Sequence, residues 1–324
     1  MDSGDVDPIG VIEQLEQHES AWANSTLNLA VALVCAGLGP AWFVLSPAPP
    51  VGPTVRVALV QPGDIADSAA RQAASEKLTA TLAGQHPDLV VWGESSMGVD
   101  LTSTPATMAE LTNLSRQVGA DLLVNVDARS PRGGIYKSSD LIGPGGSLGS
   151  YQKTRLVPFG EYVPLRPLLG WITGSTKAAA EDRRRGSGQV VLHTDSSPLI
   201  SFEATFSDLP RREVQLGAQL LVYQSSTSTF QGSWAQPQLA SHVAVHAVEV
   251  GRAAVHTGLS GVSSAFDAEG RALAWGPSIY RSVIVVEVPL GSRTTVYQRL
   301  GDWVLVLAFS ILAAATVTAT PRSR

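Results

Sequence analysis

The sequence predicts an α/β domain that is flanked by one transmembrane helix on each side. Between residues 55 and 292, short apolar runs of strand type alternate with helix-type segments, as in layered α/β domains. An uncharged stretch covers residues 24–45, and a second runs from Trp303 to Ala319, so we assign helices to 24–45 and 302–319. Only 16 % of the 324 residues are charged, against a typical share of about 25 %, which favours membrane-embedded parts.

The two flanking segments also predict how the chain is oriented. Residues 1–23 are acidic and lack Lys and Arg, so the segment that follows is not a typical signal peptide. Arg322 and Arg324 follow the second apolar stretch, and positive residues favour the cytoplasmic side of a membrane. We therefore expect a multi-pass protein of the cytoplasmic membrane. Residues 1–23 and 320–324 would be cytoplasmic, and the central domain would lie on the extracytoplasmic side.

The central region contains a strand-and-helix pattern without an internal repeat. The expected strands are 55–60, 89–92, 122–126, 135–142, 148–153, 190–193, 199–202, 219–223, 252–256, 263–267 and 283–288, and the expected helices are 68–82, 107–118 and 236–250. Residues 154–188 form a long connection rich in Pro, Gly and Arg, which is typical of a functional lid. Its apolar cluster between Leu165 and Ile172 would either enter a membrane surface or cap the domain core.

Charge and cysteine content exclude several kinds of function. The net charge of −5 gives no basic surface for nucleic acid, so we expect no nucleic-acid partner. Cys35 is the only cysteine, so neither an intrachain disulfide nor a cysteine-cluster metal site can form. His242, His246 and Glu249 have a spacing that could ligate a metal, but no HExxH motif accompanies them. We expect no metal and no cofactor.

The segment YQKTRLVPFGEYVPL, residues 151–165, is the strongest indication of chemistry. It places Lys153 eight positions before Glu161 on a loop whose Pro and Gly residues prevent a single helix. A lysine and a carboxylate on such a loop suit a site that binds a developing oxyanion. Glu94 follows the apolar strand LVVW at its carboxyl end, where α/β sheets collect ligands, and Ser201 falls at another expected strand end.

With WGESS around Glu94 and LISFEATF around Ser201 and Glu203, this segment resembles the active-site loops of apolipoprotein N-acyltransferases. These enzymes belong to the carbon–nitrogen hydrolase (nitrilase) superfamily. The resemblance implies a nitrilase-like α-β-β-α sandwich over residues 55–292, with a phospholipid as acyl donor and a diacylated lipoprotein as acceptor. It also implies roles for five residues: Glu94, Lys153 and Ser201 are catalytic, and Glu161 and Glu203 are supporting carboxylates.

Several departures from the family pattern predict impaired or absent turnover. Ser201 stands where the family has its nucleophilic cysteine, and a serine hydroxyl needs a well-placed base, usually histidine. Phe202 replaces the usual tyrosine, and the loop that follows the strand at 219–223 has become SSTSTFQG. The family also carries more membrane helices before the domain than this chain does.

Three readings remain open at this point. The first is an N-acyltransferase-like membrane protein, either impaired or inactive as a pseudoenzyme. The second is a non-catalytic protein that binds lipid or lipoprotein, or a subunit whose missing helices come from a separate polypeptide. The third is a nitrilase-type amidase, which the anchoring segments and the LVPFGEYVP motif disfavour.

Overall fold

The computed structural model describes residues 52–131, 133–169, 171, 181–291 and 293–319, together with short helical stretches between 25 and 45. It divides into two compact units, Met1–Ala48 and Pro49–Arg324. In the first unit, the described side chains of Leu29, Leu33 and Leu38 are exposed. The expected cytoplasmic segments 1–23 and 320–324 lie outside the described residues.

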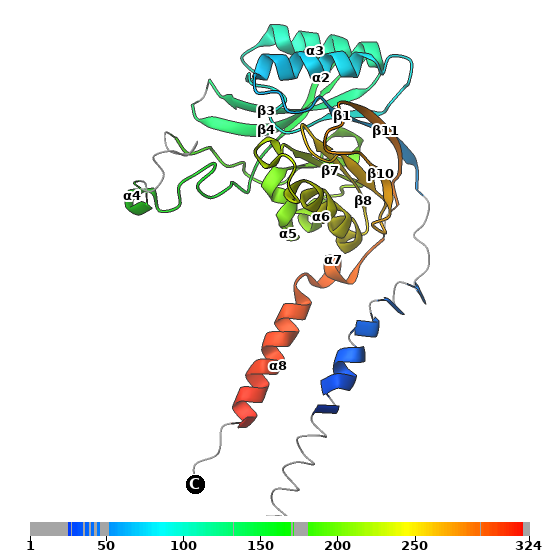
Figure 1. The fold of residues 1–324 in the computed structure, drawn as a ribbon, viewed down its shortest axis with the longest axis vertical. Helices are drawn as coiled ribbons and strands as arrows, with labels where there is room; N and C mark the ends of the chain where they lie inside the picture. Colours follow the sequence, from blue (N-terminus) through cyan, green and yellow to red (C-terminus); the bar gives the residue numbers. More distant parts are fainter. Residues whose placement is uncertain are drawn as a thin grey trace, which may run out of the picture. The chain divides into compact units, whose positions relative to one another are not determined.

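The first sheet of the second unit has six strands in the order β11-β1-β2-β3-β4-β5 (Figure 1). Its strands are β1 Thr54–Gln61, β2 Leu89–Trp92, β3 Asp121–Arg129, β4 Ile135–Gly143, β5 Gly146–Gln152 and β11 Ser282–Pro289. β1, β2 and β3 are parallel, and β4, β5 and β11 are antiparallel to their neighbours. All four residues of β2 are buried, as expected for a central parallel strand that is covered on both faces. Helices α2 (Ser68–Ala80) and α3 (Pro105–Val118) connect the parallel strands.

The second sheet has five strands in the order β10-β9-β8-β7-β6. Its strands are β6 Ser196–Ile200, β7 Leu220–Ser225, β8 Ala253–Gly258, β9 Ser264–Phe266 and β10 Ala272–Trp275. β6, β7 and β8 are parallel, with α5 (Asp208–Gln215) and α6 (Ala235–Val250) as their connections. α6 ends at Gly251, whose φ of 59° is left-handed and therefore suits glycine.

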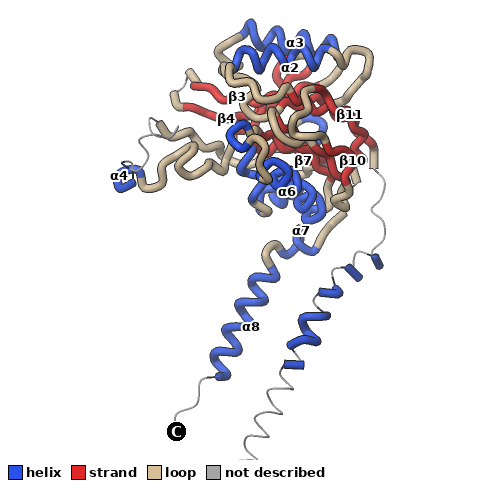
Figure 2. Tube along the Cα trace, in the orientation of Figure 1, coloured by secondary structure: helices blue, strands red, loops and turns tan. Residues whose placement is uncertain are grey.

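The helices and the two sheets form four layers (Figure 2). Hydrophobic side chains form three layers of core between them. One layer packs α2 and α3 against the first sheet, and another packs α5 and α6 against the second. The middle layer contains residues from both sheets, among them Val57, Leu123 and Val222. Gln224 also joins the sheets, because its Nε2 donates to the carbonyl oxygens of Trp92 (2.8 Å) and Leu123 (3.1 Å). The expected α-β-β-α sandwich is confirmed.

The remaining helices are short, except for one at the C-terminal end. They are α4 (Arg166–Leu169), α7 (Val296–Leu300), α8 (Trp303–Ala319) and the 3-10 turns η2 (His193–Asp195), η3 (Ser201–Thr205) and η4 (Ser228–Phe230). No helix in the described residues has both the length and the apolar character needed to cross a membrane. The spanning helices expected at 24–45 and 302–319 are therefore not confirmed.

Two expectations about secondary structure were wrong, and two elements were not expected. Residues 190–193 are not a strand, because the chain turns back there: Leu192 N donates to Ser196 O (2.8 Å) rather than to a sheet neighbour. The strand expected at 199–202 already ends at Ile200, and Ser201 begins η3. Helix α5 and strand β10 were not expected, since α5 is rich in charge and β10 is mostly exposed.

Candidate active site

Glu94 lies just beyond the carboxyl end of β2, in a turn that is held by β7. Its amide donates to Ser225 O (3.1 Å), and its Oε2 accepts a hydrogen bond from Ser226 N (2.8 Å). The turn passes so close to the end of β8 that a Cβ on Gly93 would lie 2.1 Å from Leu259 N. Only glycine fits at that position, so the sequence Gly-Glu fixes where the Glu94 carboxylate begins.

Lys137 lies on β4, two strands from β2 in the same sheet, and its side chain contacts Glu94. Its Nζ donates to Glu94 Oε1 (2.6 Å) and lies 3.7 Å from Asp127 Oδ2. Asp127 and Lys137 are cross-strand partners in the β3–β4 register, which explains their proximity. Arg183, from the far end of the long connection, donates to both carboxylate oxygens of Asp127 at 2.8 Å.

Lys153 and Glu161 form a second buried ion pair at the start of the long connection. Lys153 Nζ donates to Glu161 Oε1 (2.9 Å), and Glu161 Oε2 accepts from Val157 N (2.8 Å). Glu161 Oε1 is also 3.5 Å from Lys137 Nζ, so the two lysines share this carboxylate. The Lys153 side chain is only 1 % exposed, so its charge is screened very little by solvent.

Ser201 follows β6 with a φ of 54°, a left-handed conformation that is strained for a residue other than glycine. Such strain is concentrated at functional sites, where the surrounding structure has to impose it. The Ser201 hydroxyl has no hydrogen-bond partner in the described part of the chain.

Glu203 lies behind this turn and does not line the cavity. Its fully buried carboxylate accepts hydrogen bonds from Ile200 N (2.9 Å), Thr154 N (2.7 Å) and Arg155 N (3.0 Å). The hydroxyls of Tyr151 and Thr154 also donate to it. Glu203 therefore joins the turn that carries Ser201 to the loop that carries Lys153.

The residues expected at the site meet at one cavity of about 340 Å³. Its charged and polar lining includes Glu94, Asp127, Lys137, Lys153, Glu161, Arg183 and Ser201, and Val157 and Phe230 supply apolar surface. Three carboxylates thus face three cations. Within the described residues, no group of His, Cys, Asp and Glu side chains could hold a metal ion.

The pKa shifts follow from this arrangement of charges. Burial acts to raise the pKa values of Asp127 and Glu161, but the nearby cations outweigh it and lower both. Burial acts to lower the pKa of Lys137, yet the carboxylates of Glu94, Asp127 and Glu161 outweigh it and raise that pKa. At neutral pH, Lys137, Asp127 and Glu161 are therefore all charged.

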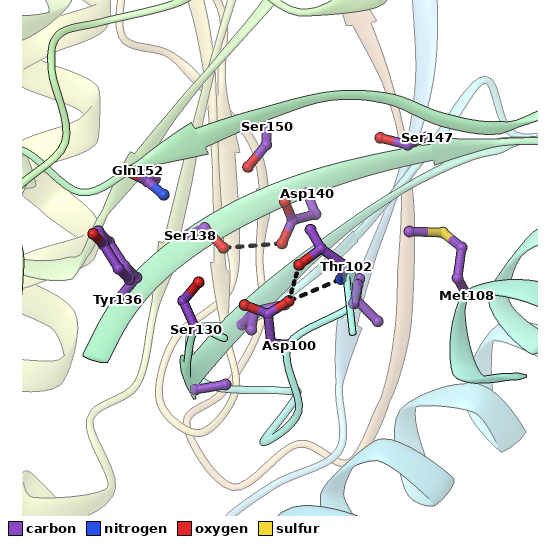
Figure 3. Close-up of a pocket in the computed structure, with 13 residues that line it drawn as sticks. Asp100, Thr102, Met108, Ser130, Tyr136, Ser138, Asp140, Ser147, Ser150 and Gln152 are labelled. Atoms are coloured by element: carbon purple, nitrogen blue, oxygen red, sulfur yellow. Dashed lines mark hydrogen bonds between the residues drawn. The ribbon is translucent and has the colours of Figure 1, made fainter. Parts of the chain in front are cut away.

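A second hollow, of about 530 Å³, lies on the other face of the first sheet (Figure 3). Successive side chains of a strand point to opposite faces, so Ser138 lines this hollow while its neighbour Lys137 lines the first. Ser138 Oγ donates to Asp140 Oδ2 (2.9 Å), and Thr102 N donates to Asp100 Oδ1 (2.8 Å). None of the residues predicted for the site lies here.

Four of the five site residues that were predicted from the sequence line this cavity. Three other charged residues that line it were not predicted. Glu94, Lys153, Glu161 and Ser201 line the cavity, whereas Glu203 supports it from behind. Lys137, Asp127 and Arg183 were not recognised. For Lys137, the available indication was a lysine inside a run, IYKSSDLIG, that otherwise has the pattern of a half-buried strand.

The chain is similar to curated bacterial proteins. An apolipoprotein N-acyltransferase of Geobacter metallireducens is 31 % identical over 239 residues, which are 72 % of this chain and 45 % of the relative. One of Sinorhizobium medicae is 30 % identical over 323 residues, covering 90 % of this chain and 60 % of the relative. The chain thus spans about half of the length of these relatives. The predicted resemblance to this group is confirmed.

Solved structures share the fold at low sequence identity. A carbon–nitrogen hydrolase from Helicobacter pylori G27 has a TM-score of 0.59 at 14 % identity and covers 74 % of this chain and 90 % of its own. Saccharomyces cerevisiae Nit3, a member of branch 10 of the nitrilase superfamily, has a TM-score of 0.57 at 16 % identity, covering 75 % and 93 %. The carbon–nitrogen hydrolase family model matches residues 56–298, so the chain belongs to the carbon–nitrogen hydrolase family.

Proposed function

We propose that this chain is an apolipoprotein N-acyltransferase-like protein of the cytoplasmic membrane whose turnover is impaired or absent. The acyl donor would be a phospholipid, and the acceptor a diacylated lipoprotein. The similarity to relatives of that name supports the substrate class. The cavity that contains a glutamate, a lysine and a hydroxyl supports acyl transfer as the reaction type.

The proposed roles follow from the chemistry of the side chains. Ser201 Oγ would attack the ester carbonyl of the phospholipid, and Glu94 would take its proton as general base. Lys153 would stabilise the tetrahedral oxyanion, and the lysophospholipid alcohol would leave with the proton. The amino group of the acceptor would then attack the carbonyl carbon of the serine ester and lose a proton to Glu94. The bond from that carbon to Ser201 Oγ would break, Oγ would take up the proton, and the amide would be formed. Glu161 would orient Lys153, and Glu203 would hold the turn before Ser201.

The environment of Ser201 is the observation that supports low turnover. Its hydroxyl has no hydrogen-bonded base among the described residues, and no histidine lines the cavity. A serine hydroxyl is a weak nucleophile unless an adjacent base removes its proton. Glu94, the carboxylate proposed for that task, already uses both oxygens, one on Lys137 and one on Ser226 N.

Mass spectrometry of a lipopeptide tests this function directly. Purified full chain is incubated with phospholipid vesicles and a synthetic diacylated lipopeptide, and triacylated product is counted over hours. We expect binding of the lipopeptide with little or no product. Robust turnover that disappears in Ser201→Ala would overturn the impaired reading and leave the acyltransferase reading standing. If the lipopeptide neither binds nor reacts, the proposed substrate class is wrong.

The variant Ser201→Cys measures how much of the loss comes from the nucleophile alone. A thiol ionises far more readily than a hydroxyl, so sulfur would react even with a poor base. We nevertheless expect only a small gain in turnover, because Glu94 would still be bonded to Lys137 and Ser226 N. Full recovery of turnover would show that Ser201 is the only defect.

We also propose that the apolar flanking segments hold the domain at a lipid surface. In α8 the side chains of Leu305, Val306 and Phe309 are 59–69 % exposed, and Leu168 and Trp171 of the long connection are exposed as well. Exposed apolar surface of this kind favours membranes or other partners. The full chain should float with anionic vesicles, and deletion of residues 302–324 should reduce flotation. Recovery in the soluble fraction without vesicles bound would contradict this.

A further inference from the structure

The Lys137 side chain is placed to control the charge of the whole cavity. Only 9 % of it is exposed, and its single ammonium group lies within 3.7 Å of three carboxylates. The shortest of these contacts, 2.6 Å, is to Glu94 Oε1. Because the carboxylates together outweigh burial and raise the Lys137 pKa, the ammonium group is retained over the physiological pH range.

Glu94 is also held by contacts that do not involve Lys137. Its Oε2 accepts from Ser226 N (2.8 Å), its amide donates to Ser225 O (3.1 Å), and Gly93 fixes the turn before it. If Lys137 lost its charge, Oε1 would still face the cavity that Ser201 lines. Lys137 is therefore not needed to place this carboxylate, but it uses the oxygen that would otherwise be available.

From these contacts we infer that Lys137 is a positioning residue that prevents Glu94 from accepting the proton of residue 201. This inference rests on the proposed acyl-transfer site. In the step concerned, the Oγ–H bond breaks and the proton moves to Glu94 Oε1. Oγ bonds to the acyl carbon while the C=O π bond opens and its electron pair moves to the carbonyl oxygen, which becomes the oxyanion. While Oε1 is paired with a nearly buried ammonium, that transfer requires the ion pair to be broken where the two charged groups are poorly solvated. Lys153 donates one hydrogen bond to Glu161 (2.9 Å), and its ammonium group has further N–H donors for the oxyanion.

A double-mutant cycle between Lys137 and Glu94 tests the inference. The background is Cys35→Ser/Ser201→Cys, which makes position 201 the only thiol in the chain. The variants Lys137→Met and Glu94→Gln are made singly and together. The readout is the rate of acylation of this thiol by a short-chain p-nitrophenyl ester, measured from pH 5 to pH 10. This ester replaces the lipid substrates, so the cycle stays informative even if the proposed substrate class is wrong.

We expect the effect of Glu94→Gln on the acylation rate to depend strongly on whether Lys137 is present. With Lys137 present, Glu94→Gln should change the rate at pH 7 by less than about 2-fold. With Lys137→Met, the rate should rise about 10-fold or more, toward the 10²-fold typical of general-base catalysis, and Glu94→Gln should abolish the gain. The Lys137→Met profile should also acquire activity at lower pH, where a carboxylate base still works and thiolate is scarce.

The controls separate this role from a structural one. Lys137→Arg keeps the charge and should keep the slow rate, whereas Lys137→Gln removes the charge and should behave like Lys137→Met, which covers the case that Met disturbs folding. Lys77→Met, at an exposed lysine on α2, should change nothing. If neutral variants slow acylation equally with Glu94 and with Gln at position 94, Lys137 supports the fold or the oxyanion, and the inference is wrong.

Discussion

The hydroxyl of Tyr151 donates a 2.7 Å hydrogen bond to Glu203 Oε1, and this buried contact joins the end of β5 to the turn that carries Ser201. The same carboxylate accepts from Ile200 N (2.9 Å), directly before Ser201. The strained φ of Ser201 therefore depends on a residue that does not itself line the cavity.

Replacing Glu203 should damage the fold more than replacing Tyr151. Glu203→Gln puts an amide N–H₂ against backbone donors and removes a charge that strengthens five hydrogen bonds, so we expect a loss of about 2–4 kcal/mol in the free energy of unfolding. Tyr151→Phe removes one donor and should cost about 1 kcal/mol. Urea unfolding measures both. Glu110→Gln, at an exposed position of α3, is the matched control and should change the stability little.

Much of this arrangement was predictable from the sequence, because it depends on local pattern. Apolar runs identified the strands, and Glu94 and Ser201 were each expected at a strand end, where α/β domains collect ligands. That their strands, β2 and β6, belong to two different sheets was not predicted. Lys137 and Asp127 were not recognised, because their position depends on the β3–β4 register and on which face of the sheet each residue occupies. That information lies in long-range pairing, which one sequence does not reveal.

The same dependence on long-range contacts explains why Glu203 was expected as a supporting carboxylate but its partners were not predicted. Its position two residues after Ser201 was visible in the sequence, whereas its bonds to Thr154 and Arg155 cross 48 or more positions of chain. A carboxylate close to a nucleophile in sequence need not face the substrate.

The buried carboxyl group of Glu213 should make the fold less stable as pH rises above about 4.5. Its carboxyl group on α5 is fully buried and unpaired within the described residues, and the hydroxyl of Ser197 donates instead to Val190 O (2.6 Å). Burial, with Glu203 nearby, raises the pKa of Glu213 well above its usual 4.5. A folded-state pKa above the unfolded value means that stability is fully present below pH 4.5 and declines as pH rises.

Glu213→Gln should remove this dependence because the amide does not titrate. We expect the unfolding temperature of the variant to gain on that of the wild type as pH rises above 5. Thermal unfolding by circular dichroism at four pH values measures the gap, with Glu110→Gln as control. A gap that stays constant with pH would show that Glu213 ionises in the fold without cost.

The buried His256 ring should have the opposite effect on the pH dependence, because it should make the fold less stable in mild acid. Its Nδ1–H donates to Val262 O (2.8 Å) and its Nε2 accepts from the hydroxyl of Ser225 (2.6 Å), so the ring is neutral with both nitrogens engaged. Burial lowers the pKa of His256 to about 4. The unfolded chain takes up the proton near pH 6.5, so this contribution disappears as pH falls from about 6.5 to 4, by about 3 kcal/mol.

His256→Gln should flatten the acid limb of the stability curve, although the variant is less stable at neutral pH. Urea midpoints at pH 4.5, 5.5, 6.5 and 7.5 give the slope, and His86→Gln, at an exposed histidine, should retain it. The lowered pKa values of Asp127 and Glu161 also reduce stability as pH falls below about 4.5, but they do so equally in the wild type and the variant, so the difference between their slopes reports on His256. An unchanged slope in His256→Gln would mean that another group causes the acid sensitivity.

Gly93→Ala should disturb the Glu94 turn more than its small size suggests. The added methyl would lie 2.1 Å from Leu259 N and 2.5 Å from its Cα, which are backbone atoms that cannot rotate away. Leu259 N also donates to Ser225 O (2.8 Å), the acceptor that holds the Glu94 amide, so a shift at Leu259 moves Glu94 as well. We expect a loss of about 3 kcal/mol or more in urea unfolding. Gly145→Ala, where a Cβ has nothing within 4 Å, is the matched control. If both substitutions cost the same, the close approach between the β2 and β8 ends does not constrain this turn.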